Sequence, residues 1–96
     1  MNWSYEPGRV YYVDETNTCL AEATYVFLDK DTVDINHTYV DPALRGQGVA
    51  GEMMEAVALQ LRQEGLKAVA SCSYANAWLM KHRDLYADVI SDDLDR

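Results

Sequence analysis

Two glycines stand one residue apart at the point where an amphipathic helix is about to begin. Glycine inside a helix costs about 1 kcal/mol relative to alanine, so this placement indicates a need for bare backbone. The first N–H groups of a helix lack partners within it and carry a partial positive charge, which binds phosphate. A neighbouring arginine adds a guanidinium that pairs with phosphate. The sequence therefore predicts a pyrophosphate cradle at Arg45, Gly46, Gln47, Gly48, Val49 and Ala50 (RGQGVA).

An ordinary glycine-containing loop before a helix explains the same letters equally well. The established nucleotide motifs do not fit, because GxxxxGK[ST] is absent and RGQGVA lacks the three-glycine spacing of a dinucleotide fingerprint. On the residues alone, the cradle and the plain loop therefore remain equal alternatives.

The composition limits the partners. At 96 residues with 49% hydrophobic and 25% charged residues, the chain is typical of a single soluble globular domain. No apolar run approaches the roughly 20 residues that a bilayer span requires, so no membrane partner is expected. A formal net charge of −8 argues against nonspecific nucleic-acid binding. That charge suits a cationic or amine partner, although solubility is the commoner reason for it.

The N-terminus and the cysteines indicate the compartment. MNWSYEPGRV has no basic start followed by an apolar stretch, so it is not a secretory signal. Cys19 and Cys72 form no CxxC pair, which favours free thiols in a reducing environment. The expected location is the cytoplasm.

The first half of the chain has the pattern of strands. Residues 9–13, 19–28 and 32–40 are rich in β-formers and are separated by polar turn clusters, which predicts a three-stranded antiparallel meander. Strict alternation in the last of these strands places four residues on one face: Val33, Ile35, His37 and Tyr39.

The period changes after Pro42. Apolar residues then recur at helical spacing from Val49 to Leu61, and Gly65 suits the end of that helix. Residues 67–72 predict a short strand parallel to the strand at 32–40. Residues 74–82 and 85–90 predict short helices, packed through Trp78, Leu79, Leu85, Tyr86, Val89 and Ile90.

These elements predict one α+β domain over residues 1–90, followed by an acidic and disordered tail at 91–96. The cradle lies between the end of a strand and the start of a helix, at the edge where open α/β sheets bind ligands.

RGQGVA also resembles the Arg/Gln-x-x-Gly-x-Gly/Ala signature of the GNAT superfamily of N-acetyltransferases, with Arg45, Gly48 and Ala50 at its defining positions. The joint pattern HTYVDPALRGQGVA, SCSYA and KHRDLYADVI resembles the small single-domain GNAT subfamily over residues 9–90. The resemblance implies a minimal GNAT fold: a mixed, mainly antiparallel sheet with one long helix after the third strand and a short helical C-terminus.

The chain departs from that subfamily at three places. Asp41 separates Val40 from Pro42, and Ala70 stands where a proline is common. The stretch from His82 to Tyr86 is one residue longer than the usual H-P-E-Y. The helices that follow the first strand in larger members are also missing, which implies a shallow acceptor pocket or one completed by a partner.

The resemblance implies acetyl-coenzyme A as co-substrate, an amine or lysine-containing chain as acceptor, and no metal. The strands ending at Val40 and Cys72 would splay apart around the pantetheine arm. The backbone N–H of Val40 would then polarise the thioester oxygen. The pyrophosphate would bind the N–H groups of the cradle, which the resemblance places at Gln47, Gly48, Val49 and Ala50.

Cys72 and His37 are the candidate catalytic residues. Cys72 would border the thioester and either accept the acetyl group or protonate the leaving thiolate. His37 could lower the pKa of Cys72 if the two side chains met, while a packing role remains the alternative for both residues. Tyr74 and Asn76 are assigned to coenzyme A contact, although a helix-start role suits Asn76 equally well.

The expected function is acetyl-coenzyme A-dependent N-acetylation of an amine. The alternative is a coenzyme A-binding regulatory module without turnover, because the walls of the acceptor site and the tyrosine acid of larger enzymes are missing.

Overall fold

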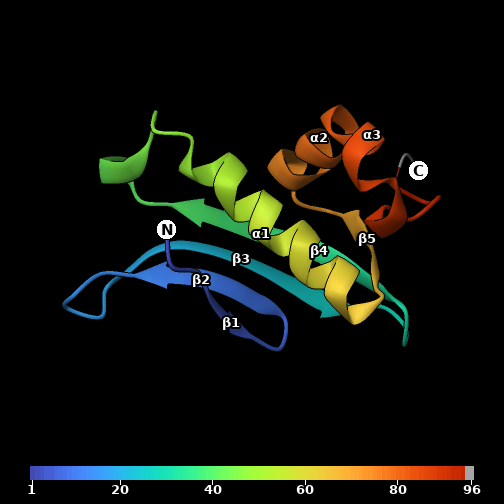
Figure 1. Cartoon of the computed structure of the whole chain (residues 1–96), viewed down its shortest axis with the longest axis horizontal. Helices are drawn as coiled ribbons and strands as arrows, with labels where there is room; N and C mark the ends of the chain where they lie inside the picture. The colour runs from blue at the N-terminus through green and yellow to red at the C-terminus, as the bar shows by residue number, and fades with distance from the viewer. Residues whose placement is uncertain (95–96) are drawn as a thin grey trace.

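The computed structural model, which describes residues 1–94, contains one five-stranded sheet with helices packed against one face (Figure 1). The strands lie in chain order across the sheet. The first four are antiparallel neighbours, and the fifth runs parallel to the fourth. The elements are β1 (Ser4–Glu6), β2 (Arg9–Val13), β3 (Cys19–Phe27), β4 (Thr32–Val40), η1 (Pro42–Leu44), α1 (Val49–Glu64), β5 (Lys67–Ala70), α2 (Ser73–Lys81), α3 (Arg83–Tyr86) and η2 (Ala87–Val89).

This architecture confirms the predicted α+β fold, including the long helix after β4 and the parallel strand β5. The sequence pattern missed β1, a three-residue edge strand that is too short to show alternation. The turn after it needs a glycine, because Gly8 has φ of 78° and a Cβ there would lie 2.7 Å from the carbonyl oxygen of Tyr25.

A β-bulge in β4 overturns the predicted face of that strand. Where β3 pairs with β4, Thr24 lies opposite His37, but the next residue of β3, Tyr25, lies opposite Ile35. Asn36 is therefore an extra residue in β4. Ile35 is fully buried, whereas the His37 side chain is 54% exposed on the other face of the sheet. The prediction that Val33, Ile35, His37 and Tyr39 share one face is therefore wrong beyond the bulge.

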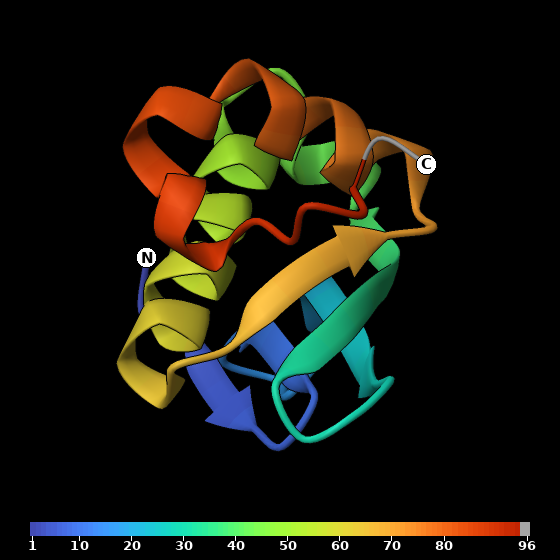
Figure 2. The ribbon, with the colours of Figure 1, turned by 90° about the vertical axis from the view of Figure 1, so that its right-hand side faces the viewer.

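The core lies between the sheet and α1. The predicted stripe of α1 is buried at Val49, Met53, Met54, Val57, Ala58 and Leu61. It faces the buried side chains of the strands, among them Val10, Ala23, Val33 and Ile35. Figure 2 shows α1 and the C-terminal helices on the same side of the sheet.

The C-terminal region differs from its prediction in three ways. Leu85, expected to pack, is 70% exposed. Strand β5 ends at Ala70, so Cys72 is the residue that precedes α2. The expected disordered tail is placed on the fold as far as Leu94, which is 3% exposed, and the Ser91 N–H donates to the Ala68 carbonyl at 2.9 Å. Asp95 and Arg96 lie outside the described residues.

Candidate functional site

A gap opens between β4 and β5. The two strands pair from Thr32 opposite Lys67 to Ile35 opposite Ala70, and the last link is the Cys72 N–H donating to the Ile35 carbonyl at 3.1 Å. Beyond this point β4 continues for five residues without β5 beside it. The splayed strands implied by the family resemblance are therefore present.

The backbone N–H of Val40 points into this gap. Val40 lies opposite Ala21, and the neighbouring Asp41 N–H donates to the Leu20 carbonyl at 2.8 Å. In an antiparallel ladder this pattern makes Val40 and Ala21 a non-hydrogen-bonded pair, whose N–H and C=O groups point away from each other. The Val40 N–H is therefore directed away from β3, and its role in polarising a thioester stays a prediction.

The glycine loop, which is the predicted cradle at residues 45–50, presents a row of backbone N–H donors between η1 and the first turn of α1. Helix α1 has no side-chain cap, and its first hydrogen bond runs from the Glu52 N–H to the Gly48 carbonyl. Within residues 1–94, no N–H group of residues 46–51 donates a hydrogen bond of good geometry, while residues 45–48 form turns. Unpaired donors at a helix N-terminus attract an anion.

Backbone conformation explains the two glycines as much as ligand access does. Gly46 and Gly48 have φ of 80° and 75°, in the left-handed region that favours glycine. A Cβ built on either residue would meet no protein atom within 4 Å. The loop therefore needs glycine for its shape, and the space above it is open.

Two side chains in this loop donate hydrogen bonds to the backbone that precedes it. The Arg45 Nε donates to the Val40 carbonyl at 3.2 Å, which holds the exposed guanidinium beside the gap. The Gln47 Nε2 donates to the Ala43 carbonyl at 3.2 Å. The remaining guanidinium donors of Arg45 are placed to meet an anion that binds the loop.

Cys72 follows β5 and precedes α2, as the glycine loop follows β4 and precedes α1. Its partly buried sulfur is 3.3 Å from the Thr38 hydroxyl oxygen. Burial raises the pKa of the thiol, but the Thr38 hydroxyl and the nearby N–H groups of Ala75, Tyr74 and Thr38 outweigh it and bring the pKa below its ordinary value. The sulfur makes no full capping hydrogen bond to α2, so the helix N–H groups act mainly as dipoles.

The structure does not bring His37 and Cys72 together. His37 lies on the open face of the sheet, where its Nε2 is 3.7 Å from Glu22 Oε1. Arg9 Nε holds the other oxygen of that carboxylate at 2.5 Å. The Cys72 partner is instead Thr38, which sequence reasoning missed because strict alternation places it on the wrong face.

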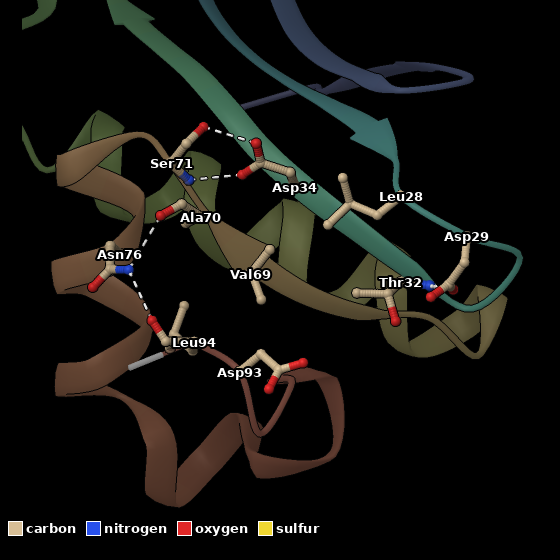
Figure 3. A pocket seen from close by; sticks show the side chains of 10 residues that line it. All are labelled: Leu28, Asp29, Thr32, Asp34, Val69, Ala70, Ser71, Asn76, Asp93 and Leu94. Carbon is tan, nitrogen blue, oxygen red and sulfur yellow. Dashed lines mark hydrogen bonds between the residues drawn. The ribbon is translucent and has the colours of Figure 1, made fainter. Parts of the chain in front are cut away.

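Tyr74 and Asn76 lie on the first turn of α2. Tyr74 is 41% exposed, and partial burial raises its pKa. The Asn76 amide nitrogen donates to the carbonyls of Ala70 at 3.1 Å and Leu94 at 3.3 Å, as Figure 3 shows. Asn76 therefore ties the end of β5 to the C-terminal segment, and its assignment to coenzyme A contact stays a prediction.

Asn76→Ala is expected to lower the free energy of unfolding by about 1–2 kcal/mol, because two carbonyls lose their donor. Urea denaturation measures this change, with the exposed Asn2→Ala as a control that leaves the midpoint in place. Equal midpoints for the two variants would show that water replaces the amide without cost.

Two hollows flank the site. A pocket of about 360 Å³ adjoins the glycine loop and is lined by Gly48, Gly51, Glu52, Glu55, Trp78, His82, Leu85 and Tyr86. Within it the rings of Trp78 and His82 stack with centroids 4.2 Å apart. Trp78 and Tyr86, which both line this pocket, were predicted from the sequence only as packing residues.

The second hollow, of about 410 Å³, lies at the other end of β4 and is drawn in Figure 3. Asp29, Asp34 and Asp93 contribute carboxylates to its lining. Asp34 accepts hydrogen bonds from the Ser71 N–H at 2.7 Å and the Ser71 hydroxyl at 2.8 Å, so this carboxylate joins β4 to the end of β5.

Among residues 1–94, no three or more His, Cys, Asp or Glu side chains are grouped as metal ligands. None of the helices in this part of the chain is long and apolar enough to cross a membrane.

Comparison with known proteins identifies the fold and the family. A GCN5-like protein from Staphylococcus aureus, with a structure determined in solution, is 38% identical with a TM-score of 0.76, over 94% of this chain and 87% of that one. The ribosomal-protein-S18-alanine N-acetyltransferase of Escherichia coli shares the fold, with a TM-score of 0.60 at 18% identity over 76% of this chain and 49% of that one.

A curated relative, Protein NATD1 of Xenopus tropicalis, is 34% identical over 58 residues, which are 60% of this chain and 53% of that protein. The chain thus matches about half the length of this relative. The sequence pattern of the family described as GCN5-related N-acetyl-transferase matches residues 9–89. The chain therefore belongs to the GCN5-related N-acetyltransferase family.

Proposed function

We propose that the protein transfers the acetyl group of acetyl-coenzyme A to a primary amine. The observation that carries this proposal is the point where β4 and β5 cease to pair, beyond which β4 leads to the backbone donors at residues 46–51 and β5 leads to the Cys72 thiol. A long ligand with an anionic middle and a thioester end fits this order of groups. Membership of the N-acetyltransferase family supports the same reaction.

In this proposal the N–H groups of the glycine loop and the Arg45 guanidinium bind the pyrophosphate of the substrate. The adjoining pocket, with its stacked Trp78 and His82 rings, suits a flat heterocycle such as adenine. The pantetheine arm runs into the gap, where the Val40 N–H is directed at the thioester oxygen. A preorganised donor there stabilises the negative charge that develops during acyl transfer.

Two routes give Cys72 a role. In the first, its thiolate attacks the acetyl carbon and the coenzyme leaves as a thiolate. The amine then takes the acetyl group and releases the Cys72 thiolate, and the proton lost by the amine passes through water to the coenzyme thiolate. In the second, the amine attacks directly, the Cys72 thiol protonates the departing coenzyme thiolate, and the proton lost by the new amide nitrogen restores the thiol. The lowered pKa of Cys72 favours the first route, because the thiolate is the nucleophile.

The surface on which the acceptor would bind is open. Within residues 1–94, no helix covers the sheet face opposite α1, the face on which His37 and Glu22 lie. An open face in a chain of net charge −8 favours a small amine or a lysine-containing chain bound weakly. The same open face supports the second candidate, a module that binds coenzyme A without turnover.

One assay separates the two candidates. The protein is incubated with acetyl-coenzyme A and a panel of amines and lysine peptides, and released coenzyme A is followed as free thiol. Acetyl transfer above the uncatalysed rate supports the enzyme. Tight coenzyme A binding with no transfer to any acceptor supports the module.

Arg45→Ala is expected to weaken coenzyme A binding by about 1.5–3 kcal/mol, the range for a hydrogen bond to a charged group. Calorimetric titration measures the change. Lys30→Ala is the matched control, because Lys30 is exposed in the hairpin at the other end of β4. Equal affinities for the two variants would remove Arg45 from the binding site.

A further inference from the structure

Thr38 is the side chain through which β4 contacts the Cys72 sulfur. Its hydroxyl oxygen lies 3.3 Å from Sγ, a distance at which a hydroxyl and a thiol form a hydrogen bond. Thr38 is partly buried and stands three residues beyond Ile35, the last residue of β4 that pairs with β5. The contact therefore spans the gap at the point where the two strands separate.

The β-bulge is the reason that Thr38 occupies this place. Residues two apart in a regular strand share a face, so Ile35 and His37 would both face the helices. The extra residue Asn36 moves His37 to the open face and turns Thr38 inward, opposite Ala23, which is fully buried. Because of this extra residue, the hydroxyl of Thr38 lies beside the Cys72 sulfur, and the imidazole of His37 lies on the other face of the sheet.

A hydroxyl suits a sulfur that changes its charge. Thr38 can accept the S–H proton when Cys72 is a thiol and donate its own O–H when Cys72 is a thiolate, because a hydroxyl has one donor and two lone pairs. Only the hydroxyl proton rotates between these states. The β-branched side chain also restricts its own χ1 rotation, so the oxygen keeps its position.

We propose that Thr38 is the positioning residue of the site, and that its hydroxyl holds the Cys72 sulfur at the mouth of the gap. This inference rests on the chemical role of Cys72 in the proposed function. Thr38 acts through Cys72 and needs no contact of its own with the acetyl group.

Alkylation of Cys72 by iodoacetamide tests the contact without acetyl-coenzyme A. The full chain carries Cys19→Ala, so that Cys72 is the reacting thiol, and the rate is measured across pH. Thr38→Val keeps the branched shape and removes the hydroxyl, whereas Thr38→Ser keeps the hydroxyl. We expect Thr38→Val to move the pH profile upward and to slow alkylation at pH 7 roughly threefold to tenfold. Thr38→Ser should restore most of the parent rate.

The proposal is overturned if Thr38→Val titrates like the parent, or if Thr38→Ser behaves like Thr38→Val. Should Thr38→Val fail to fold by circular dichroism, Thr38→Ser is compared with Thr38→Ala, since these two differ only in the hydroxyl. Equal pH profiles for that pair also overturn the proposal.

A second measurement separates this inference from the proposed function. In an active parent, Thr38→Val should lower kcat for acetyl transfer and leave the affinity for coenzyme A unchanged. If the parent protein transfers no acetyl groups, the proposed function is overturned. The contact between Thr38 and Cys72 then has no catalytic role, even if the alkylation profiles of the variants differ. An active parent with unchanged profiles overturns the positioning role alone.

Discussion

Cys72→Ala is expected to lower acetyl transfer at least about a hundredfold while coenzyme A binds as tightly as before. Removing the thiol takes away either the nucleophile or the acid of the reaction. Binding survives because the donors of the glycine loop belong to residues 46–51, before α1, whereas Cys72 precedes α2. Cys19→Ala is the matched control and should keep the parent rate, since Cys19 begins β3 and its thiol donates to the Ala21 carbonyl at 3.4 Å.

Intact mass after brief incubation with acetyl-coenzyme A distinguishes the two routes. An acetyl adduct that Cys72→Ala abolishes and Cys19→Ala retains supports transfer through Cys72. A lost rate without any adduct assigns Cys72 the role of the acid. If Cys72→Ala transfers acetyl groups as fast as the parent, both roles are wrong and Cys72 is a packing residue.

The rate at which Cys72 becomes acetylated should also depend on pH, with a midpoint set by the lowered pKa of its thiol. The pKa of Cys72 lies below the ordinary 9.0, since hydrogen-bond donors outweigh the opposing effect of burial. A lowered pKa leaves more thiolate at neutral pH, so the rate of adduct formation should rise with pH and reach half of its maximum below pH 9.0. A midpoint of the pH profile at or above pH 9.0 would contradict the shift.

Gly48→Val is expected to weaken coenzyme A binding more than about a hundredfold. A branched side chain at φ of 75° would strain the loop and stand over the N–H groups that meet the pyrophosphate. Arg45→Ala removes one side chain from the same place and should cost less.

Gly65→Val provides the control for backbone strain. Gly65 ends α1 with φ of 71°, and a Cβ there would also meet no protein atom within 4 Å. The two variants should therefore lose similar stability in urea, whereas only Gly48→Val should lose affinity in calorimetric titration. Equal losses of affinity would show that strain, and not blocked donors, explains the effect.

Much of the fold could be predicted because its signals are local. The change from a period of two to a helical period separated β4 from α1, and Gly65 marked the end of that helix. The parallel pairing of β5 followed from the helix that precedes it. Leu85 was misplaced because a four-residue helix has too little pattern to show which side is covered.

The site was predictable where backbone geometry determined it. Glycines before a helix indicated backbone donors there, whereas the role of the Val40 N–H was implied only by the family resemblance. The partner of Cys72 could not be predicted, because the bulge at Asn36 depends on the pairing of β4 with β3. Asn76 was also ambiguous, since one of its two partners is a carbonyl 18 residues farther along the chain.

Both α1 and α2 begin at the edge of the sheet where β4 and β5 separate, so two helix N-termini meet there in a chain of net charge −8. The sign of the electric field that an approaching anion meets therefore changes with its distance. Far from the surface the anion meets overall repulsion, and it meets attraction only within about one turn of the helix ends. Salt screens the long-range repulsion over about 10 Å at 0.1 M and affects close contacts less. Capture of an anion is consequently slow at low ionic strength, and moderate salt speeds the encounter.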